Sequence, residues 1–249
     1  MTTRKLRAIV TAGSTVIQWD EVRVFEMLPY LAGDNAPILP RKVHKVMHCE
    51  LRNIFRGKLG MNIAEVLASL DIDTTLIARK DLLAPDKREN RPNYSVEDFY
   101  TFDDLYGQLE RLIPEVKPDI IFMAAAVSDY TMKPESGKIS SDHSELTVTF
   151  VRSPKILDNL RRWSGPETLI CGFKLLVGVP EAHLIEVSKR QIERANTDLC
   201  VANDFRNIDY KHDYHPAMLV SKSGEVLRLG GTKKVLAESL VRNVVSRLH

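Results

Sequence analysis

Short apolar runs alternate with helically spaced apolar stripes along most of this 249-residue chain. The runs starting near Leu6, Asp73 and Lys117 are bounded by turn residues, which is typical of strands buried in a parallel sheet. Between them, Met61–Leu70 and Val96–Ile113 carry apolar residues at helical spacing. The order strand–helix–strand–helix–strand predicts an α/β fold, with a doubly wound, mostly parallel Rossmann-like sheet and helices on both faces.

The second half of the chain continues this alternation and closes with an antiparallel pair. We predict a half-exposed strand at Glu145–Phe150 and a helix that starts at Ser153-Pro154. No repeat, low-complexity tract or linker divides the chain, so we expect one domain over residues 1–249. The remaining predicted elements are strands at Leu169–Leu176 and Asp198–Asp204, a helix at Pro180–Asn196, a C-terminal β-hairpin of Pro216–Ser221 and Glu225–Leu229, and a helix at Lys233–Leu248.

Residues 24–50 differ from the rest of the chain and are interpreted as an insertion. Leu28–Pro40 contains three prolines and other turn residues, which do not favour a regular element. His44 and His48 have the spacing of a metal-ligand pair on a helix, but no acidic third ligand stands at a familiar distance. We therefore expect a surface segment or subunit contact here, and no protein-held metal site.

Charge and composition exclude several classes of function. A formal net charge of +2 offers no general attraction for nucleic acid. No apolar run approaches the roughly 20 residues that span a bilayer, and the N-terminus enters a strand without a signal-peptide region. Cys49, Cys171 and Cys200 lack metal-ligand spacing and fit reduced thiols. We expect a cytoplasmic protein that binds neither nucleic acid nor membrane.

Small or polar residues follow several of the predicted strands, where open α/β sheets bind ligands. The first such turn, Gly13-Ser14-Thr15, lacks the full G-x-G-x-x-G fingerprint, which argues against an ordinary dinucleotide site. A structural interpretation, with alanine-packed strand ends and solvated charges, fits the composition equally well. The other strand ends carry Ala125-Ala126-Val127-Ser128-Asp129 followed by Lys138, Gly172-Phe173-Lys174, and Ala202-Asn203-Asp204.

Taken in order, these blocks resemble a known enzyme family. The resemblance is to phosphopantothenoylcysteine synthetase (phosphopantothenate–cysteine ligase), the C-terminal domain of the DNA/pantothenate metabolism flavoprotein family, in its single-domain bacterial form. Each block is weak alone, but the ordered set covers nearly the whole chain outside residues 24–50. The matching blocks are Val10–Thr15 with Asp20–Arg23, Asn53–Gly60, Ala125–Tyr130 with Gly137–Ile139, Ser153–Leu157, Gly172–Lys174 and Asp198–Asp204.

The resemblance implies a two-step ligation in coenzyme A biosynthesis. The carboxylate of 4′-phosphopantothenate would attack the α-phosphate of CTP or ATP, and the amine of L-cysteine would then displace CMP or AMP. It further implies Mg²⁺ and a homodimer. No flavin is expected, because the decarboxylase half of the bifunctional members has no counterpart among the matching blocks.

The resemblance also implies roles for individual residues. Lys138 would stabilise charge at the α-phosphate, and Asn53 would orient the activated carbonyl for the amine step. In the structural alternatives, Asn53 is a helix cap and Lys138 a solvated loop charge. Arg23 and Gly57 would join Asn53 at the substrate. The nucleotide would contact Gly13, Ser14, Thr15, Ala125, Ala126, Asp129, Gly172, Phe173, Lys174, Asn203 and Asp204.

Departures from the family pattern leave alternatives open. Phe55 and Arg56 stand where the family usually has two serines, within the loop expected to cover the substrate. One alternative is a relative on the same scaffold that ligates another carboxylate; another is a protein that only binds nucleotide. A nicotinamide oxidoreductase is least favoured, because Tyr130 and Lys133 have the wrong spacing for a Tyr-x-x-x-Lys pair. CTP and ATP remain equally open as the nucleotide.

Overall fold

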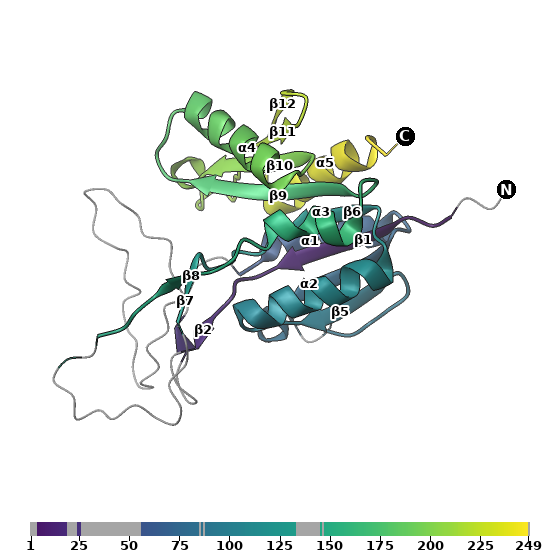
Figure 1. The fold of residues 1–249 in the computed structure, drawn as a ribbon. Coiled ribbons are helices and arrows are strands. Elements are labelled where there is room, and N and C mark those ends of the chain that lie inside the picture. The colour runs from purple at the N-terminus through teal and green to yellow at the C-terminus, as the bar shows by residue number, and fades with distance from the viewer. Residues whose placement is uncertain are drawn as a thin grey trace.

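A mixed eight-stranded sheet forms the centre of the protein (Figure 1). The computed structural model describes residues 4–18, 24–25, 56–84, 86, 88–132, 145 and 147–248. The strand order across the sheet is β12-β11-β10-β9-β6-β1-β4-β5. These strands are β1 (Arg7–Ala12), β4 (Asp73–Ala78), β5 (Tyr94–Asp98), β6 (Ile120–Met123), β9 (Leu169–Leu176), β10 (Leu199–Asp204), β11 (Ala217–Ser221) and β12 (Val226–Leu229).

The parallel part of the sheet confirms the predicted doubly wound topology. From β1 the chain proceeds outward through β4 and β5, then returns to β6 on the other side of β1 and proceeds through β9 and β10. The direction of winding therefore reverses between β1 and β6, and such a switch point is where open α/β sheets bind ligands. The predicted C-terminal hairpin, β11 with β12, pairs antiparallel against β10.

Helices cover both faces of the sheet, as predicted. In Figure 1 the near face carries α2 (Phe102–Val116), α3 (Leu157–Ser164) and α4 (Glu181–Ala195), and α1 (Lys58–Ser69) and α5 (Lys233–Val245) lie behind the sheet. The buried residues of α1 and α5 share one hydrophobic cluster with side chains of the central strands. Those of α2 and α3 pack in a second cluster on the opposite face, and α4 packs with β10 and β11.

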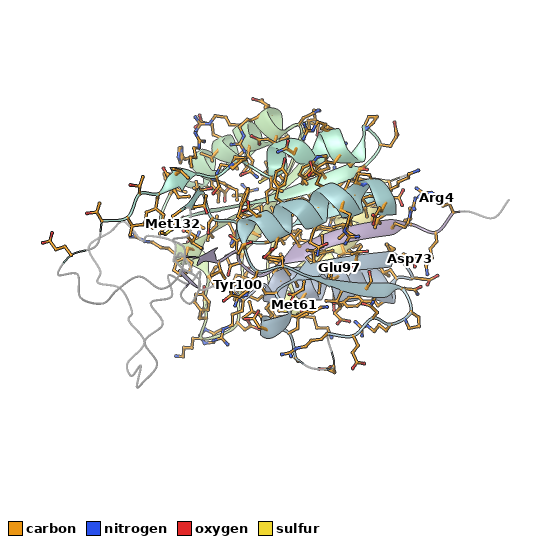
Figure 2. The ribbon with its side chains drawn as sticks, turned by 60° about the horizontal axis from the view of Figure 1, so that its bottom comes forward. Arg4, Met61, Asp73, Glu97, Tyr100 and Met132 are labelled. Atoms are coloured by element: carbon orange, nitrogen blue, oxygen red, sulfur yellow. The ribbon has the colours of Figure 1, made fainter. Side chains whose placement is uncertain are left out.

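The carboxyl ends of the parallel strands lie away from the N-terminus of the chain. Figure 2 shows Arg4 and Asp73 at the amino ends of the central strands, and Tyr100 and Met132 toward the opposite end. Two short antiparallel pairs stand outside the main sheet. They join β2 (Ile17–Gln18) to β3 (Val24–Phe25), and β7 (Tyr130–Thr131) to β8 (Val151–Arg152).

The predicted start of the second helix was wrong. Residues 96–98 belong to the edge strand β5, in which Tyr94 and Val96 are buried against β4. The helix begins only at Phe102, because Thr101 and Asp104 form a reciprocal capping box. The alternation of buried and more exposed residues over Tyr94–Asp98 favours a strand here, and the capping box at Thr101 then determines where the helix begins.

The strand predicted at Glu145–Phe150 was also wrong in place and length. The described residues of this stretch lie outside any regular element, and only Val151–Arg152 pairs, as β8. Alternating residues need a neighbouring strand to become a sheet, and within the described residues β7 pairs only Tyr130 and Thr131, with Arg152 and Val151. The helix expected from Ser153 likewise begins later, at Leu157.

None of the helices in the described part of the chain combines the length and apolar character needed to cross a bilayer. The insertion at 24–50 lies outside the described residues, apart from the two that form β3.

Candidate active site

A cavity of about 360 Å³ opens at the carboxyl ends of β6, β9 and β10, beside the switch point. Its size suits a small-molecule ligand. The segment after β6 forms one wall, and the N-terminal turns of α1, α3 and α5 converge on the space. Of the site residues predicted from the sequence, those that line the cavity are Gly57, Ala125, Ala126, Asp129, Phe173, Lys174 and Asn203. Arg56, noted above as a departure from the family pattern, lines it as well.

The Gly13-Ser14-Thr15 turn lies behind this wall and supports it. Ser14 and Thr15 are each 1% exposed, and none of the three residues lines the cavity. Gly13 O accepts a hydrogen bond from Ala126 N at 2.8 Å, and Thr15 N donates to Ala126 O at 3.1 Å. Thr15 Oγ1 also accepts from Ser128 N at 2.9 Å. The turn therefore positions the segment that follows β6.

Hydrogen bonding within the wall limits what its backbone can offer a ligand. Ala125 N donates to Thr11 Oγ1 at 3.0 Å, and Ala126 N donates to Gly13 O. Both amides already have good partners, so they are not free donors for a phosphate. The side chain of Asp129 forms an ion pair with Lys155. Positive charge for an anionic ligand must therefore come mainly from side chains.

The strand β9 places two predicted residues on opposite sides of the sheet edge. Phe173 packs with the cluster that includes α1 and α5. Lys174 is the next residue and faces the other side, where its charge acts on the thiol of Cys200. Gly172 does not line the cavity, and a Cβ there would lie 3.0 Å from Gln191 Nε2. The glycine therefore allows α4 to approach the strand closely.

Asp204 has a structural position. Its buried carboxylate accepts hydrogen bonds from Gly178 N, Val179 N and Arg206 N, each at 2.8 Å, and it does not line the cavity. Burial alone would raise the pKa of this carboxyl, but the three backbone donors outweigh it and lower the pKa from 3.8. The residue thus ties the β9–α4 loop to the end of β10.

Replacing Asp204 by asparagine is expected to destabilise the fold by about 1–3 kcal/mol, because a charged acceptor of backbone N–H groups is lost. Since the folded-state pKa is depressed, its contribution is present above the unfolded pKa of 3.8 and is lost as pH falls through the lower folded value. Urea unfolding between pH 2 and 7 measures both effects. Glu238→Gln, an exposed change on α5, is the control, and equal pH profiles of the two variants would contradict the assignment.

Three predicted site residues, Arg23, Asn53 and Lys138, lie outside the described residues. Their predicted roles therefore stay predictions. Gly57, by contrast, is described: it has a positive φ of 71° and lies against Gly13 at the start of α1.

Several cavity residues were not singled out from the sequence. Lys58 and Lys233 are the first residues of α1 and α5, and His215 precedes β11. Tyr210 stacks edge-on against His215 with ring centroids 6.0 Å apart. The sequence did predict that the last helix starts at Lys233. Nothing in the local sequence showed that this helix start would line the same cavity as the start of α1. Lys155, Gln191 and Arg194 complete the polar lining on the α3 and α4 side.

The unpaired positive charge of the lining is its main electrostatic feature. Lys58, Lys174 and Lys233 form no ion pair with any other residue in the described part of the chain. Burial lowers the pKa of Lys233, and the charge of Lys58 lowers it further, against the opposing effect of Asp213. Such a cavity favours an anionic ligand.

No group of three or more His, Cys, Asp or Glu side chains suited to a metal ion occurs within the described ranges. Asp129 lines the cavity but is paired with Lys155. These residues therefore do not form a resident metal site. A Mg²⁺ ion that enters bound to a nucleotide would be held chiefly by the phosphates and water.

Fold and site together define the class: a doubly wound α/β protein with a basic cavity at its switch point. Comparison with known families makes the assignment particular. Residues 50–248 match the DNA/pantothenate metabolism flavoprotein C-terminal domain, and the chain belongs to this family.

Curated relatives agree with the family match. The chain is 29% identical over 195 residues to the coenzyme A biosynthesis bifunctional protein CoaBC of Methanocaldococcus jannaschii, covering 78% of this chain and 45% of that protein. It is 30% identical over 190 residues to the CoaBC of Thermococcus kodakarensis, covering 76% and 45%. The chain thus spans less than half the length of these relatives.

Solved structures give the same picture. The DNA/pantothenate metabolism flavoprotein of Streptococcus pneumoniae has a TM-score of 0.75 at 26% identity, covering 97% of this chain and 99% of that one. A Cab2 variant in complex with phosphopantothenate-cysteine has a TM-score of 0.69 at 17% identity, covering 98% and 86%, and so supports the fold alone.

Proposed function

We propose that this protein ligates 4′-phosphopantothenate to L-cysteine through an acyl-nucleotide intermediate, as a phosphopantothenate–cysteine ligase of coenzyme A biosynthesis. The observation that carries the proposal is the switch-point cavity lined by Lys58, Lys174 and Lys233. In a family named for pantothenate metabolism, a basic cavity suits a reaction that brings two phosphorylated substrates together.

The first step needs positive charge. A carboxylate oxygen attacks the α-phosphorus of the nucleotide, and the bond from that phosphorus to the pyrophosphate oxygen breaks. Two anions must approach each other, so cations in the cavity lower the barrier by offsetting their repulsion. We propose that Lys174 contacts the nucleotide and that Lys138 stabilises the α-phosphate.

The second step needs a positioned carbonyl. The cysteine nitrogen attacks the carbonyl carbon, the carbon–oxygen bond to the nucleotide breaks, and CMP or AMP leaves while the amine loses a proton. We propose that Asn53 orients the carbonyl through its amide, which can donate and accept hydrogen bonds. Arg23 and Gly57 are proposed to bind the pantothenate substrate with it.

The nucleotide is proposed to contact the segment after β6 and the ends of β9 and β10. Ala125, Ala126 and Asp129 form one wall, and Phe173, Lys174 and Asn203 form another. Gly13, Ser14, Thr15, Gly172 and Asp204 support this site from behind, through the contacts described above. Whether CTP or ATP fills it is decided by experiment. We further propose a cytoplasmic homodimer that uses the nucleotide as its Mg²⁺ complex, without flavin, nucleic acid or membrane.

Pyrophosphate release tests this function directly. We expect the purified protein with Mg²⁺, CTP or ATP, 4′-phosphopantothenate and L-cysteine to release pyrophosphate only when the pantothenate substrate is present. Mass spectrometry of the product should show the amide. Release with one nucleotide and not the other identifies the co-substrate, while absence of release with both nucleotides contradicts the proposal.

A divergent relative with another carboxylate substrate is the second candidate, favoured by Phe55, Arg56 and the insertion at 24–50. A panel of carboxylates assayed for pyrophosphate release separates it from the first. A protein that only binds nucleotide would show binding by calorimetry, no release with any carboxylate, and no reaction for Lys138→Ala to affect.

A further inference from the structure

The cavity carries its unpaired cations on two opposite sides of the sheet. Lys174 follows Phe173 along β9, so the two side chains face opposite ways. The charge of Lys174 acts on Cys200, whose cluster includes Leu184 and Ile192 of α4. Phe173 instead packs with the cluster of α1 and α5. Lys174 therefore belongs to the α4 side of the cavity.

Lys58 and Lys233 lie on the other side, where α1 and α5 pack together. Each is the first residue of its helix, and both line the cavity. Gly60 allows α1 to lie close to β1, since a Cβ there would be 2.8 Å from Thr11 O. The two lysines are near enough that the charge of Lys58 acts on Lys233, and the charges of both act on His215.

Like charges held beside one cavity repel each other, and neither lysine has an ion-pair partner among the described residues. Asp213 is the acidic group nearby, but its carboxylate is hydrogen-bonded to His215 Nε2 at 3.0 Å. An anion between the lysines would remove the repulsion. The N-terminal N–H groups of α1 and α5 would add to its binding.

We propose that Lys58 and Lys233 together bind one phosphate group of a substrate, at a subsite separate from that of Lys174. Because the proposed function supplies two phosphorylated substrates, this assignment deepens it and rests on it for the identity of the ligand. The phosphate is either the monoester of phosphopantothenate or the outer phosphates of the nucleotide. These share one chemistry, and binding measurements distinguish them.

Calorimetry with pyrophosphate, 4′-phosphopantothenate and the Mg²⁺ complex of the active nucleotide forms the test. The variants are Lys58→Ala and Lys233→Ala, with Lys233→Arg to retain the charge. Lys234→Ala is the matched control, because Lys234 is the next residue of α5, is exposed and does not line the cavity. Lys174→Ala measures the contribution of the lysine on the α4 side of the cavity.

We expect each alanine variant at 58 or 233 to weaken binding of one phosphorylated substrate about 10- to 100-fold, since a charge-assisted contact is lost. Lys233→Arg should recover most of it. A loss confined to phosphopantothenate assigns the subsite to the monoester, and a loss confined to the nucleotide assigns it to the outer phosphates. Unchanged binding of all three ligands in both variants, or losses equal to those of Lys234→Ala, overturns the subsite.

The two proposals fail in different ways. Pyrophosphate binding needs no ligase activity, so a protein that forms no amide but loses pyrophosphate affinity in Lys58→Ala and Lys233→Ala retains the subsite and refutes the ligase. A protein that makes the amide with both variants at wild-type KM and kcat refutes the subsite and retains the ligase. Circular dichroism and unfolding curves confirm that each variant is folded.

Discussion

Replacing Gly57 by alanine is expected to lower ligase activity at least about 100-fold and to destabilise the fold by about 2–4 kcal/mol. A Cβ at this position would lie 2.2 Å from Gly13 N and 2.8 Å from Gly13 Cα, and both are backbone atoms. The positive φ of 71° adds strain for any L side chain. The start of α1, including Lys58, must therefore shift away from the switch point.

Gly107→Ala is the matched control for this prediction. Gly107 lies within α2, and a Cβ there would meet nothing within 4 Å. Because alanine is the better helix former, this variant should be more stable by up to about 1 kcal/mol and fully active. Urea unfolding and steady-state kinetics measure both variants. A Gly57→Ala protein with wild-type stability and activity would show that the close approach to Gly13 is unimportant.

Removing Lys138 or Asn53 is expected to have the largest effects on the reaction itself, and at different steps. If Lys138 has its proposed role, Lys138→Ala should reduce pyrophosphate release by about 100- to 1000-fold, because charge at the α-phosphate would no longer be stabilised. Asn53→Ala should still form the acyl-nucleotide but transfer it poorly to cysteine. Isotope exchange between pyrophosphate and nucleotide, measured without cysteine, reports the first step alone.

Two results would contradict these roles. Wild-type exchange in Lys138→Ala would remove that lysine from the first step, and rapid amide formation in Asn53→Ala would remove the asparagine from the second. Lys80→Ala, a change in the 3₁₀ turn after β4 and outside the cavity, controls for general loss of positive charge. Each variant needs an unfolding curve to show that the fold is intact.

Much of the architecture could be predicted from local pattern. The bounds of β9 were predicted to the residue, and β4 begins at the predicted Asp73, because each is a short run between clear turn signals. Pro180 and Asn196 likewise mark the ends of α4: proline precedes its first turn, and asparagine adopts the left-handed conformation at its C-terminus. These signals depend only on neighbours within one or two turns of chain.

The misplaced elements depend on more distant partners. Tyr94–Asp98 is a strand because β4 offers it an edge, whereas the described residues of Glu145–Phe150 have no strand partner among the described part of the chain. The hydrogen bonds of Asp204 depend on distant partners as well, since two of its three backbone donors, Gly178 N and Val179 N, belong to the loop between β9 and α4. A strand-end aspartate looks the same in sequence whether it faces a ligand or caps a loop.

The sequence by itself determined the doubly wound sheet, the order of its strand ends and the family, because apolar periodicity and turn chemistry are local and the matching blocks occur in order. Only the tertiary structure decided which of those ends line one cavity and which lie behind it. It also brought together Lys58 and Lys233, which are far apart in the chain. The physical reason is that a binding site is made by helix packing and strand order across the sheet, and no local pattern encodes that two helix ends distant in the chain line the same cavity.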